Sequence, residues 1–419
     1  MAIEIDASPP GLSTPDSLRS LRGPLAFAVA CFVVWGLAYG LLDVLNKHFQ
    51  ETLHVGKAQS TWLQMAYFGA YLIMSLPAGM LLQARGYKFG IVFGLGVTAV
   101  GALLFIPAAH VASFPYFVGS MFVLASGLCF LETAADTYVN VLGPPEHASR
   151  RLNLAQSFNA LGVFFGPLIG GALFFEQGDP ASAQQAVQGT YLVIAIAVLI
   201  FAAVVARARL PELGASHGLE GGHAAPGGAT GRDTLARPHF VFGVITQALY
   251  IGAQVGIGAF FINLVTETWH GLTSRDGAFL LSIATAAYLI GRFATTALLL
   301  RFRPRAVLTV YGLINLALCL VVAAGIAKVS AVALIAVFFF MSTMFATIFT
   351  LGVADLGAAT KRGASMMVMA IGGGVLLPYP MGRIAEAYGT PAAFLLPAVC
   401  FAVVAAYGWR GAQGTHANA

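Results

Sequence analysis

Long apolar stretches alternate with short polar links along almost the whole chain. A helix needs about 20 apolar residues to cross the hydrocarbon core of a membrane. Stretches of that kind begin near residues 25, 60, 88, 115, 152, 188, 239, 275, 305, 330, 363 and 391. The pattern predicts an all-α membrane protein with twelve transmembrane helices.

One link is longer than the others and divides the chain into two groups of six stretches. Residues 208–237 are rich in Gly, His, Ala and Thr and have no apolar periodicity, as in a flexible connector. The first stretch is longer than a signal-peptide core and lacks a clean cleavage site, so we expect a retained span. The predicted domains are a disordered cytoplasmic leader at 1–23, six-helix bundles at 24–207 and 238–410, a cytoplasmic linker at 208–237, and a tail at 411–419.

The composition excludes most other classes of protein. Hydrophobic residues make up 58% of the chain and charged residues 9%, and the mean hydropathy is +0.81. A soluble globule could not hide so much apolar surface, so a soluble enzyme, a nucleic-acid-binding module and a disordered chain are excluded. The four cysteines lie in apolar stretches without a CxxC or Cys/His cluster, so we expect neither disulfides nor a metal site, and no cofactor.

The basic residues predict the orientation in the membrane. If the N-terminus is cytoplasmic, sixteen of the 22 Lys and Arg residues fall in cytoplasmic segments and four on the opposite side. This asymmetry follows the positive-inside rule. We therefore expect both termini to be cytoplasmic, which requires an even number of spans.

The two halves of the chain share a sparse pattern of residues. Arg151 is followed by glycine after 11 residues and by proline after 16, and Arg362 is followed by the same residues at the same spacings. Parallel six-helix halves are the plan of the major facilitator transporters. Chance matches in a glycine-rich chain are the alternative, so the pattern supports this fold without proving it.

Three acidic residues fall inside predicted spans. Asp43 lies in the outer part of the first span, and Glu132 lies near the middle of the fourth with Asp136 one turn further on the same face. An ionisable group in a membrane helix is costly and marks a substrate or ion path by default. Desolvation favours the neutral form of such a carboxyl group, so Asp43 and Glu132 are candidates for binding and releasing a proton. The alternative is a carboxyl group that only holds helices together, and for Asp136 the two interpretations are balanced.

Polar and aromatic residues of other spans are candidates for binding a ligand. Asn153, Gln156 and Asn159 recur every three residues and must face the bundle interior, where amides suit a polyhydroxylated neutral ligand or bond neighbouring helices. We favour ligand binding for Gln156 and Asn159 and helix packing for Asn153. Further candidates for the sugar site are Trp35, Tyr39, Gln64, Gln254, Asn263 and Tyr288, although single aromatic residues are more often core or interface residues.

Two basic, glycine-containing segments are candidate gating loops. The first contains Gly79, Arg85 and Lys88 after the second span, and the other follows Gly291-Arg292 after the eighth span. Major facilitators keep such loops on the cytoplasmic side.

Several ordered motifs together resemble one family. They are Trp35-Gly-Leu-Ala-Tyr-Gly-Leu-Leu-Asp43, Leu131-Glu132-Thr-Ala-Ala, Val141-Leu-Gly-Pro144, Arg151-Leu-Asn-Leu-Ala-Gln-Ser-Phe-Asn159, Gly252-Ala-Gln254 and Gly372-Gly-Gly374. The chain resembles the fucose–galactose–glucose:proton symporters of the major facilitator superfamily from about residue 25 to 410.

The resemblance implies a function and a set of site residues. It implies a carrier of a neutral hexose and a proton in the bacterial inner membrane, with Asp43 and Glu132 as the coupling carboxyl groups and Gln156 and Asn159 on the sugar. Where relatives carry Asn-Pro after the Glu132 motif, this chain has Asp136-Thr137. The extra acid could modulate Glu132 or change which sugar is accepted.

We therefore expect a monomeric proton-coupled symporter of a neutral monosaccharide, L-fucose or a related hexose, that works by alternating access. The expected partners are the sugar, the proton and the lipid bilayer. The alternatives are a proton-independent exporter or facilitator of small neutral solutes and a non-transporting sugar sensor. No catalytic constellation favours a membrane enzyme.

Overall fold

The computed structural model describes residues 22–142, 148–175, 180–208, 237–354, 356 and 360–411. Within these ranges the chain forms helices and no strand. The first half contains α2 (Arg22–Thr52), α3 (Lys57–Ser60), α4 (Trp62–Val111), α5 (Phe114–Val141), α6 (Ala148–Phe174) and α7 (Pro180–Arg207). The second half contains α10 (Pro238–Thr268), α11 (Ser274–Leu298), α12 (Pro304–Ala323), α13 (Ala327–Met341), α14 (Met344–Val353), α15 (Thr360–Met369), η4 (Ala370–Val375), α16 (Pro378–Tyr388), α17 (Thr390–Ala393), α18 (Leu395–Ala406) and a final π turn, Tyr407–Gly411.

Eleven helical segments of the described chain are long and apolar enough to cross a membrane, against twelve predicted spans. The segment Lys57–Val111 has 55 residues, about twice the length that one crossing needs. Its α4 part contains Gly86 in a non-helical conformation with φ 81°. A Cβ atom on Gly90 would lie 3.0 Å from Leu82 Cδ1, which a straight helix would hold about two turns away. The chain thus bends sharply at Gly86, and the segment consists of two helical arms.

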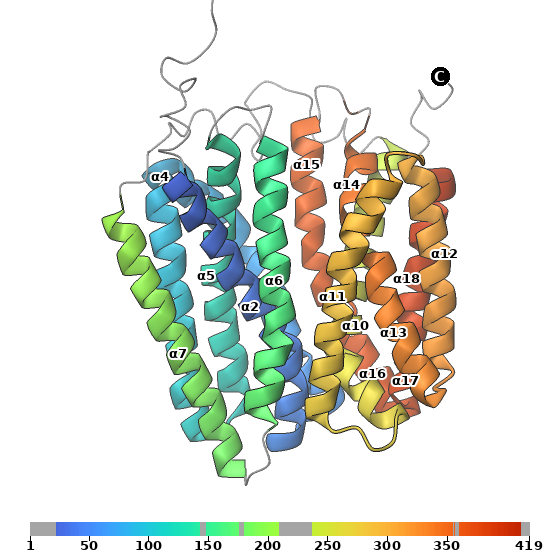
Figure 1. The fold of residues 1–419 in the computed structure, drawn as a ribbon, viewed down its shortest axis with the longest axis horizontal. Helices are drawn as coiled ribbons and strands as arrows, with labels where there is room; N and C mark the ends of the chain where they lie inside the picture. Colours follow the sequence, from blue (N-terminus) through green and yellow to red (C-terminus); the bar gives the residue numbers. More distant parts are fainter. Residues whose placement is uncertain are drawn as a thin grey trace, which may run out of the picture.

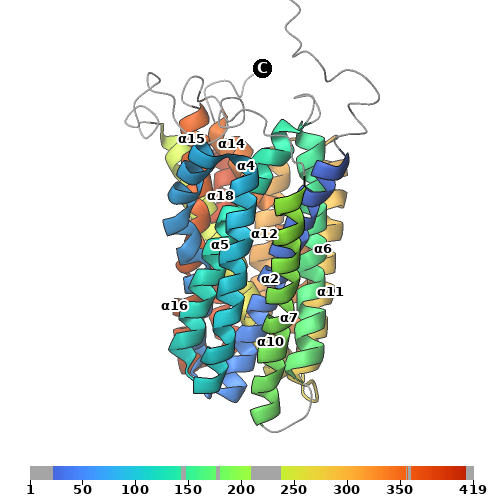
Figure 2. The same ribbon diagram turned by 90° about the vertical axis from the view of Figure 1, so that its left-hand side faces the viewer.

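The two halves stand side by side as two helical bundles (Figure 1). The blue-to-green helices α2–α7 form one bundle, and the yellow-to-red helices from α10 onward form the other. Seen from the first half, α4, α5, α6 and α7 lie in front of the second half (Figure 2). We call the end where α2 begins and α7 ends the linker end, and the end where α10 ends and α11 begins the distal end.

Within the first half, α2 and α6 cross at paired glycines. Gly36 and Gly40 of α2 face Gly162 and Gly166 of α6, each pair spaced by four residues. A Cβ atom on Gly166 would lie 2.5 Å from Gly40 Cα, and one on Gly162 would lie 2.6 Å from the carbonyl oxygen of Val33. In a membrane, such small-residue faces let two backbones pack closely. The backbones of α2 and α6 therefore pack directly against each other at this crossing.

The halves are joined by polar contacts toward the distal end. Lys57 Nζ lies 2.7 Å from Glu267 Oε1 and donates to Thr390 Oγ1 at 2.9 Å. Glu386 Oε1 accepts from the backbone N–H of Ala58 at 2.9 Å. We call these residues the distal latch, since α3 of one half is tied to α10, α16 and α17 of the other.

Glycines also allow a close contact in the second half, where Gly372-Gly373-Gly374 lies in the 3₁₀ segment η4. A Cβ atom on Gly374 would lie 2.6 Å from Phe68 Cγ of α4, and one on Gly373 would collide with Ala248 of α10. The triplet therefore packs η4 closely against both halves.

Several predictions fall partly outside the described residues. The leader at 1–23, the linker at 208–237 and the tail at 411–419 lie almost wholly outside them, as do Gly143 and Pro144 of one family motif.

We predict that Gly166→Ala destabilises the protein by about 1–3 kcal/mol, because the added methyl group overpacks the contact with Gly40. Thermal unfolding of the purified protein in detergent measures the effect. The matched control is Gly96→Ala in α4, where a Cβ atom meets nothing within 4 Å. Helix propensity favours alanine by about 1 kcal/mol, so the control should be neutral or stabilising, and equal melting temperatures for both variants would contradict the packing argument.

Candidate functional site

Asp43 lies where the two halves of the protein meet. It is partly buried on α2, and Gln64 Nε2 of α4 donates to its Oδ1 across 3.4 Å. The carboxyl group also lies directly against Gly258 of α10, where a Cβ atom would collide with Oδ2. None of the ion pairs between described residues includes Asp43. An acid without a cation therefore occupies the contact between α2 and α10.

Asp43 begins a polar stripe on α2 that continues toward the distal end. Asn46 Nδ2 donates to the carbonyl oxygen of Ala259 at 2.7 Å, and Gln50 Oε1 accepts from Asn263 Nδ2 at 2.6 Å. Asp43, Asn46 and Gln50 follow the three- and four-residue spacing of one helix face. We call this contact the α2–α10 seam. Asn263, which the sequence predicts as a sugar contact, lies in this seam. Its side-chain amide forms a hydrogen bond with Gln50 of the other half.

Aromatic residues of both halves surround Asp43. Tyr39 precedes it by one turn and lies within electrostatic range of it and of Tyr288 on α11. Tyr288 in turn interacts with Tyr250 of α10 and has the Arg292 guanidinium 5.7 Å from its ring centre. The structure therefore brings Tyr39 and Asp43 of α2 near Tyr288 of α11.

Glu132 lies in a second cluster, between α2, α4 and α5. Tyr71 of α4 is within electrostatic range of Glu132 and stacks on Tyr67, with ring centres 5.3 Å apart. Trp35 Nε1 of α2 donates to the Tyr67 hydroxyl at 3.2 Å. Tyr67 also contacts Tyr39, with ring centres 5.9 Å apart, so one aromatic residue bridges the two carboxyl clusters.

The space beside Glu132 is narrow in this conformation. A void with no room for a water molecule is lined by Cys31, Phe32, Trp35, Leu131, Glu132 and Ala135. Oε2 of Glu132 and Oδ1 of Asp136 are buried without a hydrogen-bond partner. The two acids lie one turn apart and interact electrostatically, as their spacing predicts.

The amide residues of α6 lie close to α2. Asn159 Nδ2 donates to the carbonyl oxygen of Phe32 at 3.2 Å, so this amide contributes to helix packing. Gln156 is partly buried one turn earlier, and the side chain of Asn153 is outside the described part of the chain. Gln254 is partly buried on α10, one turn before Gly258.

The candidate gating residues have two different positions. Arg85 and Lys88 flank the bend at Gly86, and Gly79 is buried in the preceding helical arm. Arg292 lies inside α11, which continues to Leu298, so it precedes the basic segment that follows the eighth predicted span. The apolar residues after Arg292 extend the helix beyond it.

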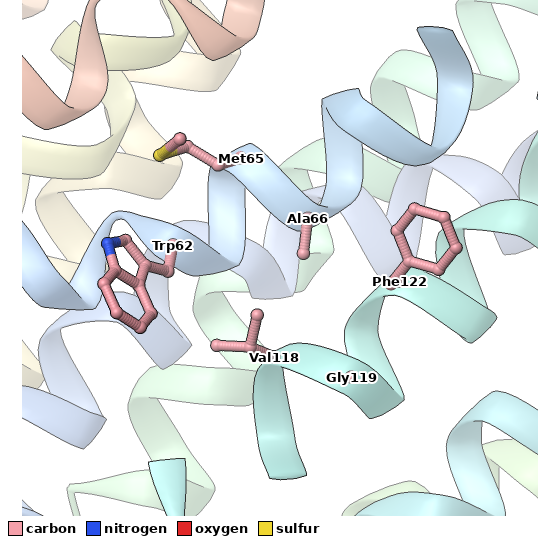
Figure 3. A pocket seen from close by; sticks show the side chains of 6 residues that line it. All are labelled: Trp62, Met65, Ala66, Val118, Gly119 and Phe122. Carbon is pink, nitrogen blue, oxygen red and sulfur yellow. The ribbon is translucent and has the colours of Figure 1, made fainter. Parts of the chain in front are cut away.

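A depression on the protein is separate from these polar clusters. It has a volume of about 420 Å³ and lies between α4 and α5. Its lining is almost entirely apolar, and Trp62 is 41% exposed at its edge (Figure 3). No carboxyl or amide side chain lines it, so it lacks the groups that orient a polar ligand.

Four residues of the site were not predicted from the sequence. Tyr67 and Tyr71 bridge the carboxyl clusters, and their four-residue spacing was the available signal. Asn46 and Gln50 repeat the helical spacing from Asp43, which identifies a polar face but not its partner. In the part of the chain that the structure describes, no group of three or more His, Cys, Asp or Glu residues could bind a metal ion.

Comparisons with known proteins give the family. The family profile described as Major Facilitator Superfamily matches residues 26–377. A glucose/galactose transporter of Brucella abortus biovar 1 (strain 9-941) is 34% identical over 417 residues, which cover 99% of this chain and 100% of the relative. The L-fucose-proton symporter of Escherichia coli (strain K12) is 36% identical over 406 residues, which cover 92% of each chain.

A solved structure agrees with this result. The crystal structure of the transporter FucP in the outward conformation is 34% identical and has a TM-score of 0.68, covering 94% of this chain and 100% of that one. Together with the two-bundle fold, these findings establish that the chain belongs to the Major Facilitator Superfamily, in the branch of the glucose/galactose transporters and L-fucose-proton symporters.

Proposed function

We propose that this protein is a symporter that carries a neutral monosaccharide, L-fucose or a related hexose, together with a proton across the bacterial inner membrane. Its two bundles open the binding site alternately to either side, and it works as a monomer without catalysing a reaction. The names of the relatives, which include glucose/galactose transporters and L-fucose-proton symporters, support the substrate class.

The position of Asp43 is the observation that carries this proposal. Its carboxyl group lies in the α2–α10 seam against Gly258, and Gln64 is its long-range hydrogen-bond donor. A carboxylate in this contact would lose water without gaining a cation, which is unfavourable in a low-dielectric environment. Closure of the seam is therefore linked to the protonation state of Asp43, which is the property that coupling to a proton requires.

The aromatic and amide residues near the two acids suit a sugar. Trp35, Tyr39 and Tyr71 are partly buried and offer both ring faces and hydrogen-bonding groups. Gln156 of α6 adds an amide that can donate and accept. A neutral polyhydroxylated ring can stack on the aromatic residues and bond to the amide and the acids.

The distribution of basic residues supports the proposed orientation. The described residues Arg85, Lys88, Arg151 and Arg207 belong to segments at the linker end, whereas Lys57 lies in the distal latch. Because cytoplasmic segments are enriched in Lys and Arg, we assign the linker end and both termini to the cytoplasm. The structure is then closed toward the outside.

We predict that sugar added to de-energised cells expressing the protein makes the medium alkaline, because the sugar enters with a proton. A pH electrode measures the effect with L-fucose, galactose, glucose and related sugars in turn. Cells with the empty vector are the control. Sugar entry without alkalinisation would favour a facilitator, and neither entry nor alkalinisation would favour a sensor.

We predict that Asp43→Asn and Glu132→Gln each abolish uptake driven by a pH gradient, because a permanently neutral side chain cannot release its proton. Uptake into proteoliposomes with and without a gradient measures the loss. Asp276→Asn makes the same chemical change at a partly exposed residue of the α11 capping box and should leave uptake intact. Gradient-driven uptake at the unaltered rate in both site variants would refute their coupling role.

We predict that Lys57→Glu opens the distal end more often, because it replaces the ion pair with Glu267 by a repulsion. A cysteine introduced by Ala58→Cys, at a position 4% exposed in the latch, reports opening through its reaction with a membrane-impermeant maleimide. Partly exposed ion pairs contribute up to about 1 kcal/mol, so labelling should be about two- to fivefold faster.

The control for the latch is the swapped pair Lys57→Glu with Glu267→Lys, which restores the attraction and should restore slow labelling. Equal labelling rates in the single variant, the swapped variant and the unaltered pair would show that the ion pair does not hold the distal end closed.

A further inference from the structure

Asp136 is a buried acid that the coupling scheme does not use. It lies four residues after Glu132 on α5, so their Cα atoms are about 6 Å apart along the helix axis. Because α5 runs from the distal end to the linker end, Asp136 is one turn nearer the linker end. Both residues are partly buried on the same face.

The two acids are not neutralised by a cation in the described part of the chain. The ion pairs found there include neither of them, and each has one buried oxygen without a hydrogen-bond partner. The two carboxyl groups interact with each other. Two neighbouring carboxylates repel, so a site of this kind holds one negative charge more readily than two. One proton shared between both groups removes the repulsion.

The helices that pack against α5 carry cations toward the linker end. Titratable or charged groups around the pair and on its linker side include Cys31 of α2, Tyr67, Tyr71, Arg85, Tyr87 and Lys88 of α4, Cys129 and Tyr138 of α5, and Arg151 of α6. Arg151 Nε donates to the carbonyl oxygen of Val139 at 3.0 Å, and Arg85 and Lys88 flank the bend at Gly86. None of the ion pairs between described residues joins these cations to Glu132 or Asp136.

We propose that Asp136 is the inner member of a two-carboxyl relay, which takes the proton from Glu132 and passes it to water at the linker end. This inference rests on the proposed symport function. In the relay step, the O–H bond of the Glu132 carboxylic acid breaks and an O–H bond forms on the Asp136 carboxylate. During this transfer the pair keeps one proton and one negative charge. When the O–H bond of the Asp136 carboxylic acid then breaks, the proton leaves as hydronium, and both groups are carboxylates until Glu132 takes up the next proton. Chains of acidic residues carry protons in this way through membrane proteins.

The closed distal end gives the relay its direction. In the relay, the latch and the α2–α10 seam hold that end shut, and the proton leaves toward the linker end, where Asp136 comes first. Glu132 lies beside Trp35 and the void without room for water. Asp136 then connects Glu132 with the solvent at the linker end.

The test separates proton release from sugar binding. Full-length protein with Asp136→Asn is reconstituted in proteoliposomes, and two rates are measured. Counterflow exchanges labelled for unlabelled sugar without net proton release, whereas gradient-driven uptake requires it. The relay predicts that net uptake and sugar-linked acidification of the lumen, read with a trapped pH dye, both fall by at least about tenfold. Counterflow should stay within about twofold of the unaltered rate, since sugar binding is intact.

Two variants serve as controls. Asp136→Glu keeps a carboxyl group and should rescue net uptake. Thr137→Val changes the next residue, whose hydroxyl donates to the Thr133 carbonyl oxygen within the same helix, and should leave both rates unchanged.

Three other outcomes would each overturn the relay. Unchanged net uptake in Asp136→Asn would overturn the relay and leave the proposed function standing. Loss of counterflow together with uptake would assign Asp136 to sugar binding or folding and would also overturn it. Absence of sugar-linked proton movement in the unaltered protein would overturn the proposed function, and the relay with it.

Discussion

The high cost of an unpaired charge in an apolar bundle is the constraint on which the arrangement of this protein depends. The chain contains few acids inside its spans, and the structure places them at helix contacts, away from the lipid. Asp43 lies against a glycine of the other half, and Glu132 lies beside Trp35 and Tyr71. In both places the carboxyl group has no cation partner among the described residues. Its protonation state therefore depends on how the neighbouring helices pack, and the packing of those helices depends on its charge.

Two kinds of helix contact hold the helices together, one within the first half and the other between the halves. Within the first half, the glycines of α2 and α6 bring two backbones so close that no side chain fits between them. Such a contact cannot loosen without losing its packing. Between the halves, the contact is a polar stripe with hydrogen bonds from Asn46 and Asn263 and an ion pair of Lys57. Polar groups of this kind can exchange protein partners for water when the end opens, so the halves can separate while each half stays rigid.

The same helix takes part in both contacts. One face of α2 presents Gly36 and Gly40 to α6, and another presents Asp43 and Asn46 to α10. A movement of α10 relative to the first half therefore acts directly on Asp43. A change of charge on Asp43 acts in turn on the seam, and no longer chain of residues is needed to connect the proton site with the movement.

The helical membrane fold, the two halves, the superfamily and the three acids inside the spans could all be predicted from the amino-acid sequence. Hydrophobic length decides which segments cross a membrane, and a lone acid in such a segment is visible without coordinates. The spacing of Glu132 and Asp136 also placed them on one face, because the period of a helix is a local property. Contacts between residues of different helices could not be predicted in this way. Asn263 bonds Gln50, Tyr67 links Trp35 to Tyr39, and Gly258 covers Asp43, because contacts between distant segments depend on how the helices pack.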